Sequence, residues 1–369
     1  MKLVCSKSNL LTGLQVVSKA VPNKTTMSIL ECILIDSTSG EIKLTANDME
    51  LGIETIIEGE ILEKGIIALD AKIFLEIVRK LPDNDITITT DSNFKTAITC
   101  EKAKFNIIGK SGEDFSYLPM IERNESIIIS QYPLKEVIRQ TIFSISDNDN
   151  NKLMSGELFE INGEEMRVIS LDGHRISIRK IHLKNSYPAK KVVVPGKTLN
   201  EISKILSGDA DKDVTIFFTD KHIVFEFENT TVVSRLIEGE YFKIDQMLSS
   251  DYETKVIIHK KELLDCIDRA TLLIKEGDKK PIIINITDGS MELKINSTVG
   301  SMDEEIDIEK MGKDLMIGFN PKFLIDALRV IDDETITIYL VNPKAPCFIR
   351  DEENNYIYLI LPVNFTTVS

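Results

Sequence analysis

The sequence predicts an α+β fold in which one domain-sized module of helices and antiparallel strands occurs three times. The first observation is a set of similar segments that begin at Lys72, Lys197 and Lys322, each 125 residues after the one before. Each segment contains an amphipathic helix pattern, a polar turn and a strand pattern, as in "KIFLEIVRKLPDNDITIT". The second observation is that "LTANDMELGIE", "VISLDGHRISI" and "LKINSTVGSMDEEI" recur at steps of 124 and 125 residues. This period is too long for a solenoid repeat and indicates a triplicated domain.

A helix pattern opens each module, and a second one follows near its middle. The six predicted helices cover residues 6–24, 70–81, 133–143, 196–207, 259–276 and 320–331. Between them, segments such as "DITITTDSNFKTAITCEKAKFNIIG" alternate apolar and polar residues, which predicts hairpin-linked strands. Such strands form antiparallel sheets with one face in solvent, so we expect the two helices of a module to cover the other face. Polar stretches near 117–126 and 246–255 predict domains at 1–122, 123–248 and 249–369.

Cysteine usage and the N-terminal segment predict a cytoplasmic protein. The chain has 369 residues and five cysteines, an odd number without any C-x-x-C pair. This pattern is typical of reduced thiols rather than of a disulfide or zinc framework. The start "MKLVCSKSNLLTGLQ" lacks the apolar core of a signal peptide, and no apolar run approaches the ~20 residues that cross a bilayer. We therefore expect no membrane association.

Charge is distributed unevenly between the helices and the rest of the chain. The net charge of −15, taken alone, argues against a nucleic-acid partner. The six predicted helices, however, carry 16 Lys and Arg against nine Asp and Glu, so they are net +7 and the remainder is −22. If the helices share one side of an assembly, that side attracts phosphate while the acidic exterior repels other DNA. The alternative is that Lys and Arg are simply good helix formers on solvated faces.

Motifs for covalent chemistry or metal binding are missing from the sequence. It has no phosphate-binding G-x-x-x-x-G-K-[ST] loop, no H-E-x-x-H and no G-x-S-x-G. The stretch 147–150 resembles half of a calcium loop but lacks the later Gly and Glu, so a polar loop is the better interpretation. His182 and His222 lie in strand patterns as surface residues, and His259 stands where it could cap a helix. We expect no cofactor, no metal and no catalytic residue.

The stretch "SLDGHRISIRK" combines an Asp-Gly turn signal with a histidine and an arginine. Asp172, His174 and Arg175 could belong to a plain hairpin turn, to the rim of a docking surface or to a catalytic site. Catalysis would need a nucleophile or second base within hydrogen-bond reach, and the sequence suggests none. The structural interpretation comes first, docking second and catalysis last.

Five motifs in order give the chain a specific resemblance: "LTANDMELGIE", "SLDGHRISI", "LIEGEYFKI", "MIGFNPKFLIDAL" and "YIYLILPV". With them the whole chain resembles the bacterial DNA polymerase III beta subunit family, the DNA sliding clamps. The resemblance implies three clamp domains per chain, forming a crescent that dimerises head to tail into a closed ring. Helices would line the hole around duplex DNA and sheets would form the outer wall. It also implies a non-catalytic processivity factor that tethers the polymerase catalytic subunit, the clamp loader and repair polymerases.

The resemblance also implies three sets of site residues. The partner-peptide pocket would comprise Met154, Leu171, Gly173, His174, Arg175, Ile176, Phe242, Gln246, Met247, Leu359, Leu361 and Val363, with His174 and Arg175 as polar handles. Phosphate contacts would come from Lys24, Lys72, Lys197 and Lys322, and less certainly from Lys7, Lys19, Arg79, Lys80, Arg139, Lys204 and Arg329. The dimer interface would pair edge strands and use Phe105 and Ile107 against Leu272 and Leu273.

Three pocket positions depart from the family pattern, and two other functions compete with the clamp. Phe242 replaces a usual proline, Gln246 a common arginine and Leu171 a small residue, which affects the shape and peptide preference of the pocket. The main alternative is an acidic dimeric scaffold that binds peptides without enclosing DNA. A hydrolase using His174 is the other.

Overall fold

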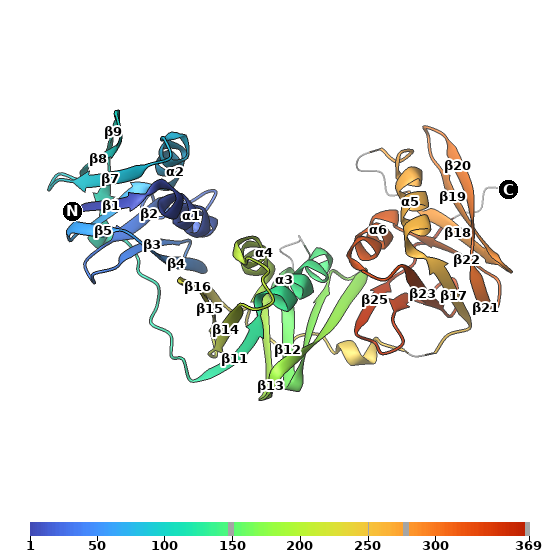
Figure 1. Ribbon diagram of the computed structural model, residues 1–369. Helices are drawn as coiled ribbons and strands as arrows, with labels where there is room; N and C mark the ends of the chain where they lie inside the picture. The colour runs from blue at the N-terminus through green and yellow to red at the C-terminus, as the bar shows by residue number, and fades with distance from the viewer. Residues whose placement is uncertain (147–150, 250, 276–279, 366–369) are drawn as a thin grey trace. The chain divides into compact units, whose positions relative to one another are not determined.

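The computed structural model describes residues 1–146, 151–249, 251–275 and 280–365, and these form two compact units (Figure 1). The first unit contains residues 1–132 and 197–236, and the second contains residues 133–196 and 237–365. The middle of the chain therefore contributes to both units. The predicted calcium-like stretch 147–150 lies outside the described residues.

Six α-helices occur in the described part of the chain, at the six places that the sequence predicts. They are α1 (Lys7–Val17), α2 (Ala71–Lys80), α3 (Gln131–Arg139), α4 (Gly196–Ile205), α5 (Lys260–Thr271) and α6 (Pro321–Val330). Side chains of Ser6, Asp70 and Asn320 accept backbone hydrogen bonds at the starts of α1, α2 and α6. His259 takes the same position before α5, but its side chain makes no capping hydrogen bond.

The first helix is shorter than predicted. α1 ends at Val17 and is followed by the short 3-10 helix η1 (Ser18–Ala20), after which Val21 is extended. Pro22 explains this break, because the residue before a proline is disfavoured in the helical region. Lys24 therefore lies in a loop.

The first unit contains two antiparallel sheets. One has the order β5 (Glu60–Glu63), β1 (Lys2–Ser6), β7 (Asp85–Thr90), β8 (Lys95–Cys100) and β9 (Ala103–Ile108). The other has the order β10 (Lys110–Ser111), β6 (Ile66–Asp70), β2 (Cys32–Asp36), β3 (Ile42–Asn47), β4 (Leu51–Ile57), β16 (Thr230–Arg235), β15 (His222–Phe227), β14 (Asp213–Phe218) and β11 (Glu125–Ser130). The β4–β16 pairing joins strands of the first and second modules, with Gly52 opposite Val233.

The second unit has the same plan. Its larger sheet has the order β12 (Gly156–Leu171), β13 (Arg175–Pro195), β25 (Tyr356–Ile360), β24 (Cys347–Arg350), β23 (Thr335–Leu340), β17 (Thr254–His259) and β21 (Glu309–Gly312). Its smaller sheet has the order β20 (Ser301–Asp307), β19 (Ser290–Asn296), β18 (Ile282–Thr287) and β22 (Leu315–Phe319). Here the β13–β25 pairing joins the second and third modules, with Arg175 opposite Ile360.

The α+β modules with antiparallel sheets are confirmed, but sheet membership differs from the expectation of one sheet per module. The strands of a module are divided between sheets, and neighbouring modules share a sheet. Alternation of apolar and polar residues reports which face of a strand is buried but not which strand lies beside it. The two compact units divide the chain at other positions, so they do not test the predicted domain boundaries 122/123 and 248/249, which stay predictions.

Apolar side chains of helices and sheets meet in the core of each unit. In the second unit Leu263 and Ile267 of α5 and Leu328 of α6 belong to one buried cluster with Ile284 and Leu293 of the smaller sheet. Cys5, Cys32, Cys100, Cys266 and Cys347 are all buried, and none of them forms a disulfide. Across the described residues, no helix combines the length and apolar character of a membrane-spanning segment.

The second set of sequence landmarks forms the same hairpin turn in all three modules. The backbone N–H of Asp48 donates to the carbonyl of Leu51 at 3.0 Å, and that of Asp172 donates to the carbonyl of Arg175 at 3.3 Å. Ser297 donates to Gly300 in the same way at 2.9 Å. The internal repeat therefore extends to individual hydrogen bonds.

Candidate functional site

The "LDGHR" stretch is the tight turn between β12 and β13, as its Asp-Gly pair predicts. Gly173 has a φ of +88°, a conformation that glycine adopts without strain. The carboxylate of Asp172 accepts hydrogen bonds from the backbone N–H of His174 at 2.9 Å and of Arg175 at 3.2 Å. Asp172 therefore fixes the turn and is occupied by the backbone.

Arg175, which the resemblance implies as a polar handle of the pocket, is buried. Its side chain is 6% exposed. The guanidinium donates to Asp172 Oδ2 at 3.0 Å, to Asp326 Oδ2 at 2.6 Å and to the Phe143 carbonyl at 2.6 Å. It also lies over the ring of Phe323, 4.5 Å from the centroid. These bonds leave Arg175 little capacity for a ligand, and they hold the turn against α6.

His174 is exposed and fits the rim of a docking surface. Its ring lies 6.0 Å from the ring of Phe323, centroid to centroid. Within the residues that the structure describes, its imidazole makes no side-chain hydrogen bond to a nucleophile or a carboxylate. A hydrolase would need such a pair, so the geometry gives no support to catalysis by His174.

The apolar residues of the implied pocket gather in one cluster of the second unit. Leu171 and Ile176 flank the turn, and Leu359 comes from β25. All three are buried, with Met154 and Phe242 half-buried against them. The structure thus brings together segments that are far apart in sequence.

The remaining pocket residues surround this cluster. Gln246 and Met247 lie exposed at the end of the short helix η5 (Ile244–Gln246). The backbone N–H of Leu361 donates to the His174 carbonyl at 2.8 Å, so the chain after β25 runs along the turn. Val363 donates to the Gly318 carbonyl at 2.9 Å and is half-buried. Exposed apolar side chains beside a buried floor are what a docking peptide requires.

Sequence reasoning missed several members of the cluster. Phe348 and Ile244 are buried in it, and Leu153, Tyr241 and Leu248 are packed against it. The hydroxyl of Tyr241 donates to the Ile169 carbonyl at 3.4 Å, and burial followed by the nearby Glu157 raises its pKa. Leu153 and Leu248 could have been found as apolar neighbours of Met154 and Met247, whereas Phe348 carries no local signal.

Three of the four predicted phosphate contacts occupy one repeated position, and the fourth, Lys24, lies in a loop. Lys72, Lys197 and Lys322 are each the second residue of the second helix of a module, and each is exposed. Lys197 forms an ion pair with Asp48. Lys24, Lys72 and Lys322 have no ion-pair partner among the residues described.

The less certain basic residues are mostly engaged with acids or carbonyls. Arg79, Lys204 and Arg329 also occupy one repeated position, and they pair with Glu76, Glu201 and Asp268. Arg139 pairs with Glu136 and Asp332. Lys7 donates to the Leu81 carbonyl, where it closes the end of α2. These basic side chains are therefore engaged in ion pairs or hydrogen bonds within the chain.

β9 and β20 are edge strands, each paired on one side only within the described chain. Phe105 on β9 is 41% exposed, and Ile107 beside it is half-buried. Leu272 is 81% exposed, but it follows α5 rather than lying on an edge strand. Leu273 packs against the core beside β20, with its Cδ2 near Gly300. An interface at this edge would thus combine a strand with the end of a helix.

Models of the DNA polymerase III beta subunit match nearly the whole chain. The N-terminal domain matches residues 1–119, the central domain 128–243 and the C-terminal domain 245–364. The chain belongs to the DNA polymerase III beta subunit family. It is therefore a DNA sliding clamp, a processivity factor of DNA replication, and the peptide scaffold without DNA is not favoured.

Similar proteins extend over the full length of this beta subunit. The beta sliding clamp of Staphylococcus aureus is 33% identical over 374 residues, which cover 98% of this chain and 99% of that protein. A crystal structure of a putative DNA polymerase III beta subunit from Eubacterium rectale is 77% identical, with a TM-score of 0.97. It covers 99% of this chain and 100% of its own. The polymerase sliding clamp of Bacillus subtilis is 32% identical, with a TM-score of 0.95 and the same coverage.

The described residues contain no group of three His, Cys, Asp or Glu side chains that could hold a metal ion.

Proposed function

We propose that the clamp works as a head-to-tail homodimeric ring that encloses duplex DNA and carries out no covalent chemistry. The observation that carries this proposal is the repeated lysine at the second position of α2, α4 and α6. A triplicated module that keeps a cation at one position presents three equivalent contacts to a partner of repeating charge. The DNA backbone is such a partner.

The local electrostatics of these helices support a phosphate contact. A helix N-terminus carries partial positive charge, so acids are stabilising there and lysines are not. The first turns of α1, α2, α3, α4 and α6 contain no acidic residue. Lys322 therefore adds charge to an already positive end, which lowers stability slightly and attracts an anion, whereas at α2 the capping carboxylate of Asp70 offsets part of the charge of Lys72. A local conflict of this kind is expected at a functional surface.

Lys24, Lys72, Lys197 and Lys322 would contact phosphates of any sequence, because backbone contacts position a duplex without reading bases. Lys197 would exchange its partner Asp48 for phosphate, so its contribution is the smallest of the four. Such contacts are salt-sensitive and permit sliding.

Dimerisation is proposed through the free edges of β9 and β20. Unpaired strand edges are templates for pairing with another chain. Phe105 on β9 and Leu272 beyond α5 add exposed apolar surface near these edges, and Ile107 and Leu273 lie beside them. Lys104 on β9 and Glu305 on β20 are exposed and opposite in charge. An unlike pair of edges makes a heterologous contact, which yields a ring when the rotation closes.

The apolar cluster around Leu171, Ile176 and Leu359 is proposed to bind short peptides of the polymerase catalytic subunit, the clamp loader and repair polymerases. His174, Gln246, Met247 and Leu361 would form the exposed rim. A few buried anchors give most of the affinity in such a pocket. Tethering then raises the effective concentration of a bound polymerase at its template. A reducing, cytoplasmic location remains the prediction.

Retention on circular DNA tests the proposal. The purified clamp is loaded on nicked circular DNA, separated from free protein by gel filtration, and the DNA is then linearised. A ring stays on the circle and leaves the linear product. A protein that binds peptides without enclosing DNA elutes identically before and after cleavage, and that result would reject the ring.

A further inference from the structure

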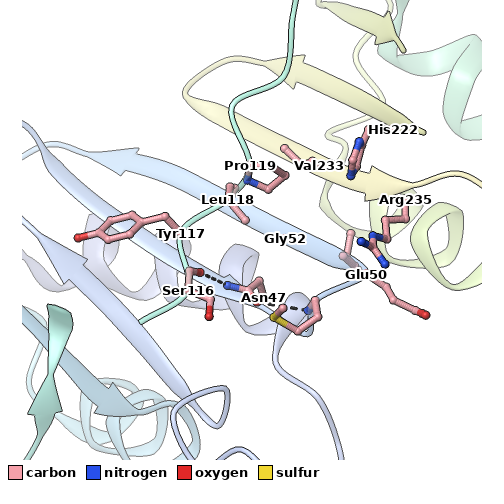
Figure 2. Close-up of a pocket in the computed structure, with 12 residues that line it drawn as sticks. Asn47, Glu50, Gly52, Ser116, Tyr117, Leu118, Pro119, His222, Val233 and Arg235 are labelled. Atoms are coloured by element: carbon pink, nitrogen blue, oxygen red, sulfur yellow. Dashed lines mark hydrogen bonds between the residues drawn. The ribbon is translucent and has the colours of Figure 1, made fainter. Parts of the chain in front are cut away.

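A second hollow lies in the first unit, where strands of the first and second modules share a sheet (Figure 2). Its volume is about 280 Å³, enough for one or two side chains. It is lined by the β3–β4 turn, by the segment 116–119, and by the ends of β15 and β16. None of the residues implied for the partner-peptide pocket contributes to it.

The hollow is the counterpart, in the internal repeat, of the proposed peptide pocket. Asp48 accepts hydrogen bonds from the backbone N–H of Glu50 at 3.0 Å and of Leu51 at 2.7 Å, as Asp172 does in its own turn. Met49 takes the left-handed conformation of Gly173, with a φ of +77°.

The strand beside the turn also repeats. Arg235 donates its backbone N–H to the Glu50 carbonyl at 2.9 Å, just as Leu361 donates to His174 at 2.8 Å. Glu50 therefore corresponds to His174 and Arg235 to Leu361. The proposed pocket and this hollow use one backbone scaffold with different side chains.

The floor of the hollow already holds an aliphatic side chain. A Cβ on Gly52 would lie 2.0 Å from Cδ2 of Leu118, so only glycine at this position leaves room for Leu118. Asn47 Nδ2 donates to the Ser116 carbonyl and fixes the segment that carries Leu118 (Figure 2). Val233 and Leu51 are buried beside it. The site therefore accepts aliphatic groups.

The rim of this hollow carries an arginine and a histidine. His222 and Arg235 are cross-strand partners on β15 and β16 and lie side by side (Figure 2). In the part of the chain that the structure describes, the Arg235 guanidinium forms no ion pair or hydrogen bond. Burial, then Arg235 and Lys221, lower the pKa of His222, which favours the neutral imidazole, so His222 serves as a hydrogen-bond donor beside the charge of Arg235. Glu50 is the one acid among the lining residues.

We propose that this hollow is a second docking site, for an extended peptide with an aliphatic residue followed by acidic residues. The aliphatic side chain would rest on Leu118 and Val233, and the carboxylates would meet Arg235 and His222. The inference rests on the proposed peptide-binding function and extends it to a site of different charge preference. Two pockets of one scaffold would let a clamp hold two unlike partners on one chain.

Photo-crosslinking to the full-length clamp tests this inference. The probe is an acetylated Ser-photoleucine-Asp-Asp peptide with a C-terminal biotin, and the matched probe carries Asn-Asn. Labelled residues are located by mass spectrometry in the wild type, in Arg235→Ala, and in Arg123→Ala as a control on the same unit. We expect the Asp-Asp probe to label residues 47–52, 116–119 or 233–235. Arg235→Ala and the Asn-Asn probe should each reduce this labelling roughly fivefold in low salt, as for a partly exposed ion pair.

The other outcomes separate the two hypotheses. Labelling confined to residues 153–176, 242–247 and 359–363 overturns the second site but leaves the proposed peptide pocket standing. Equal labelling of the hollow by both probes also overturns the inference. Labelling at neither place rejects both.

Discussion

Replacing Glu157 by methionine is expected to stabilise the second unit, and increasingly so as the pH rises. Glu157 lies on β12 and is 0% exposed. Neither carboxylate oxygen has a hydrogen-bond partner among the described residues. The hydroxyl of neighbouring Thr141 donates to the Val137 carbonyl at 2.7 Å, so its proton is engaged elsewhere. Burial therefore raises the pKa of Glu157 well above its ordinary value.

The sign and size of the effect follow from proton linkage. Above about pH 4.3 the unfolded chain releases this proton while the folded chain keeps it. The free energy of unfolding then falls by about 1.4 kcal/mol per pH unit, until the pH reaches the folded-state pKa. An unpartnered buried polar group costs about 1–3 kcal/mol in addition. Methionine has similar length and no charge, so Glu157→Met removes both costs.

Hydrogen exchange of peptides from β12 and β13, followed by mass spectrometry, measures the local stability of the strands around Glu157. Wild type and variant are compared at the same pH, at pH 6 and at pH 8, and at one protein concentration. Glu160→Gln is the control, since Glu160 lies on the same strand but pairs with Arg167 and Lys191. A variant that is less protected than wild type at both pH values would refute the reasoning.

Four further predictions concern the proposed surfaces and the turn that contains Arg175. Lys72→Glu and Lys322→Glu should each weaken DNA binding and lower the slope of log affinity against log salt by about 2 in a dimer; an unchanged slope, measured by titration, would exclude these contacts. Phe105→Asp should shift the sedimentation coefficient toward the monomer, whereas Leu62→Asp, on the opposite edge strand β5 of the same sheet, should not. Arg175→Ala should lower the free energy of unfolding by about 3–5 kcal/mol, because it leaves Asp326 and Asp172 without their partner. Leu361→Asp should weaken peptide binding in an anisotropy titration at unchanged melting temperature, and equal affinity would contradict the pocket.

The module and its helices could be predicted because their signals are local. The 3.6-residue periodicity of each helix and the motifs that repeat every 125 residues can be read directly from short stretches of sequence. The three equivalent turns at Asp48, Asp172 and Ser297 reproduce the repeat. The sharing of sheets could not be predicted, because the pairing of β4 with β16 depends on residues about 180 positions apart.

The role of a residue could be predicted only where its place in a helix or strand pattern determines whether its side chain is exposed. Lys72 and Lys322 are exposed, as their place on helices suggests. Arg175 is buried because Asp326, 151 residues away, supplies a partner that no local pattern reveals. Leu272 lies after a helix rather than on an edge strand because α5 ends at Thr271.

The pairings of β4 with β16 and of β13 with β25 have a consequence for recombination between relatives. A crossover at residue 122 would pair β4 of one parent with β16 of the other, along Leu51–Thr55. A crossover at residue 248 would do the same to β13 and β25, along Arg175–Arg179. Three crossovers made together, at 132/133, 196/197 and 236/237, place residues 1–132 and 197–236 in one parent and the rest in the other, so each strand pair comes from one parent. Chimeric clamps should therefore be spliced inside the second module, and a lone module cut at its ends would leave a bare strand prone to aggregate.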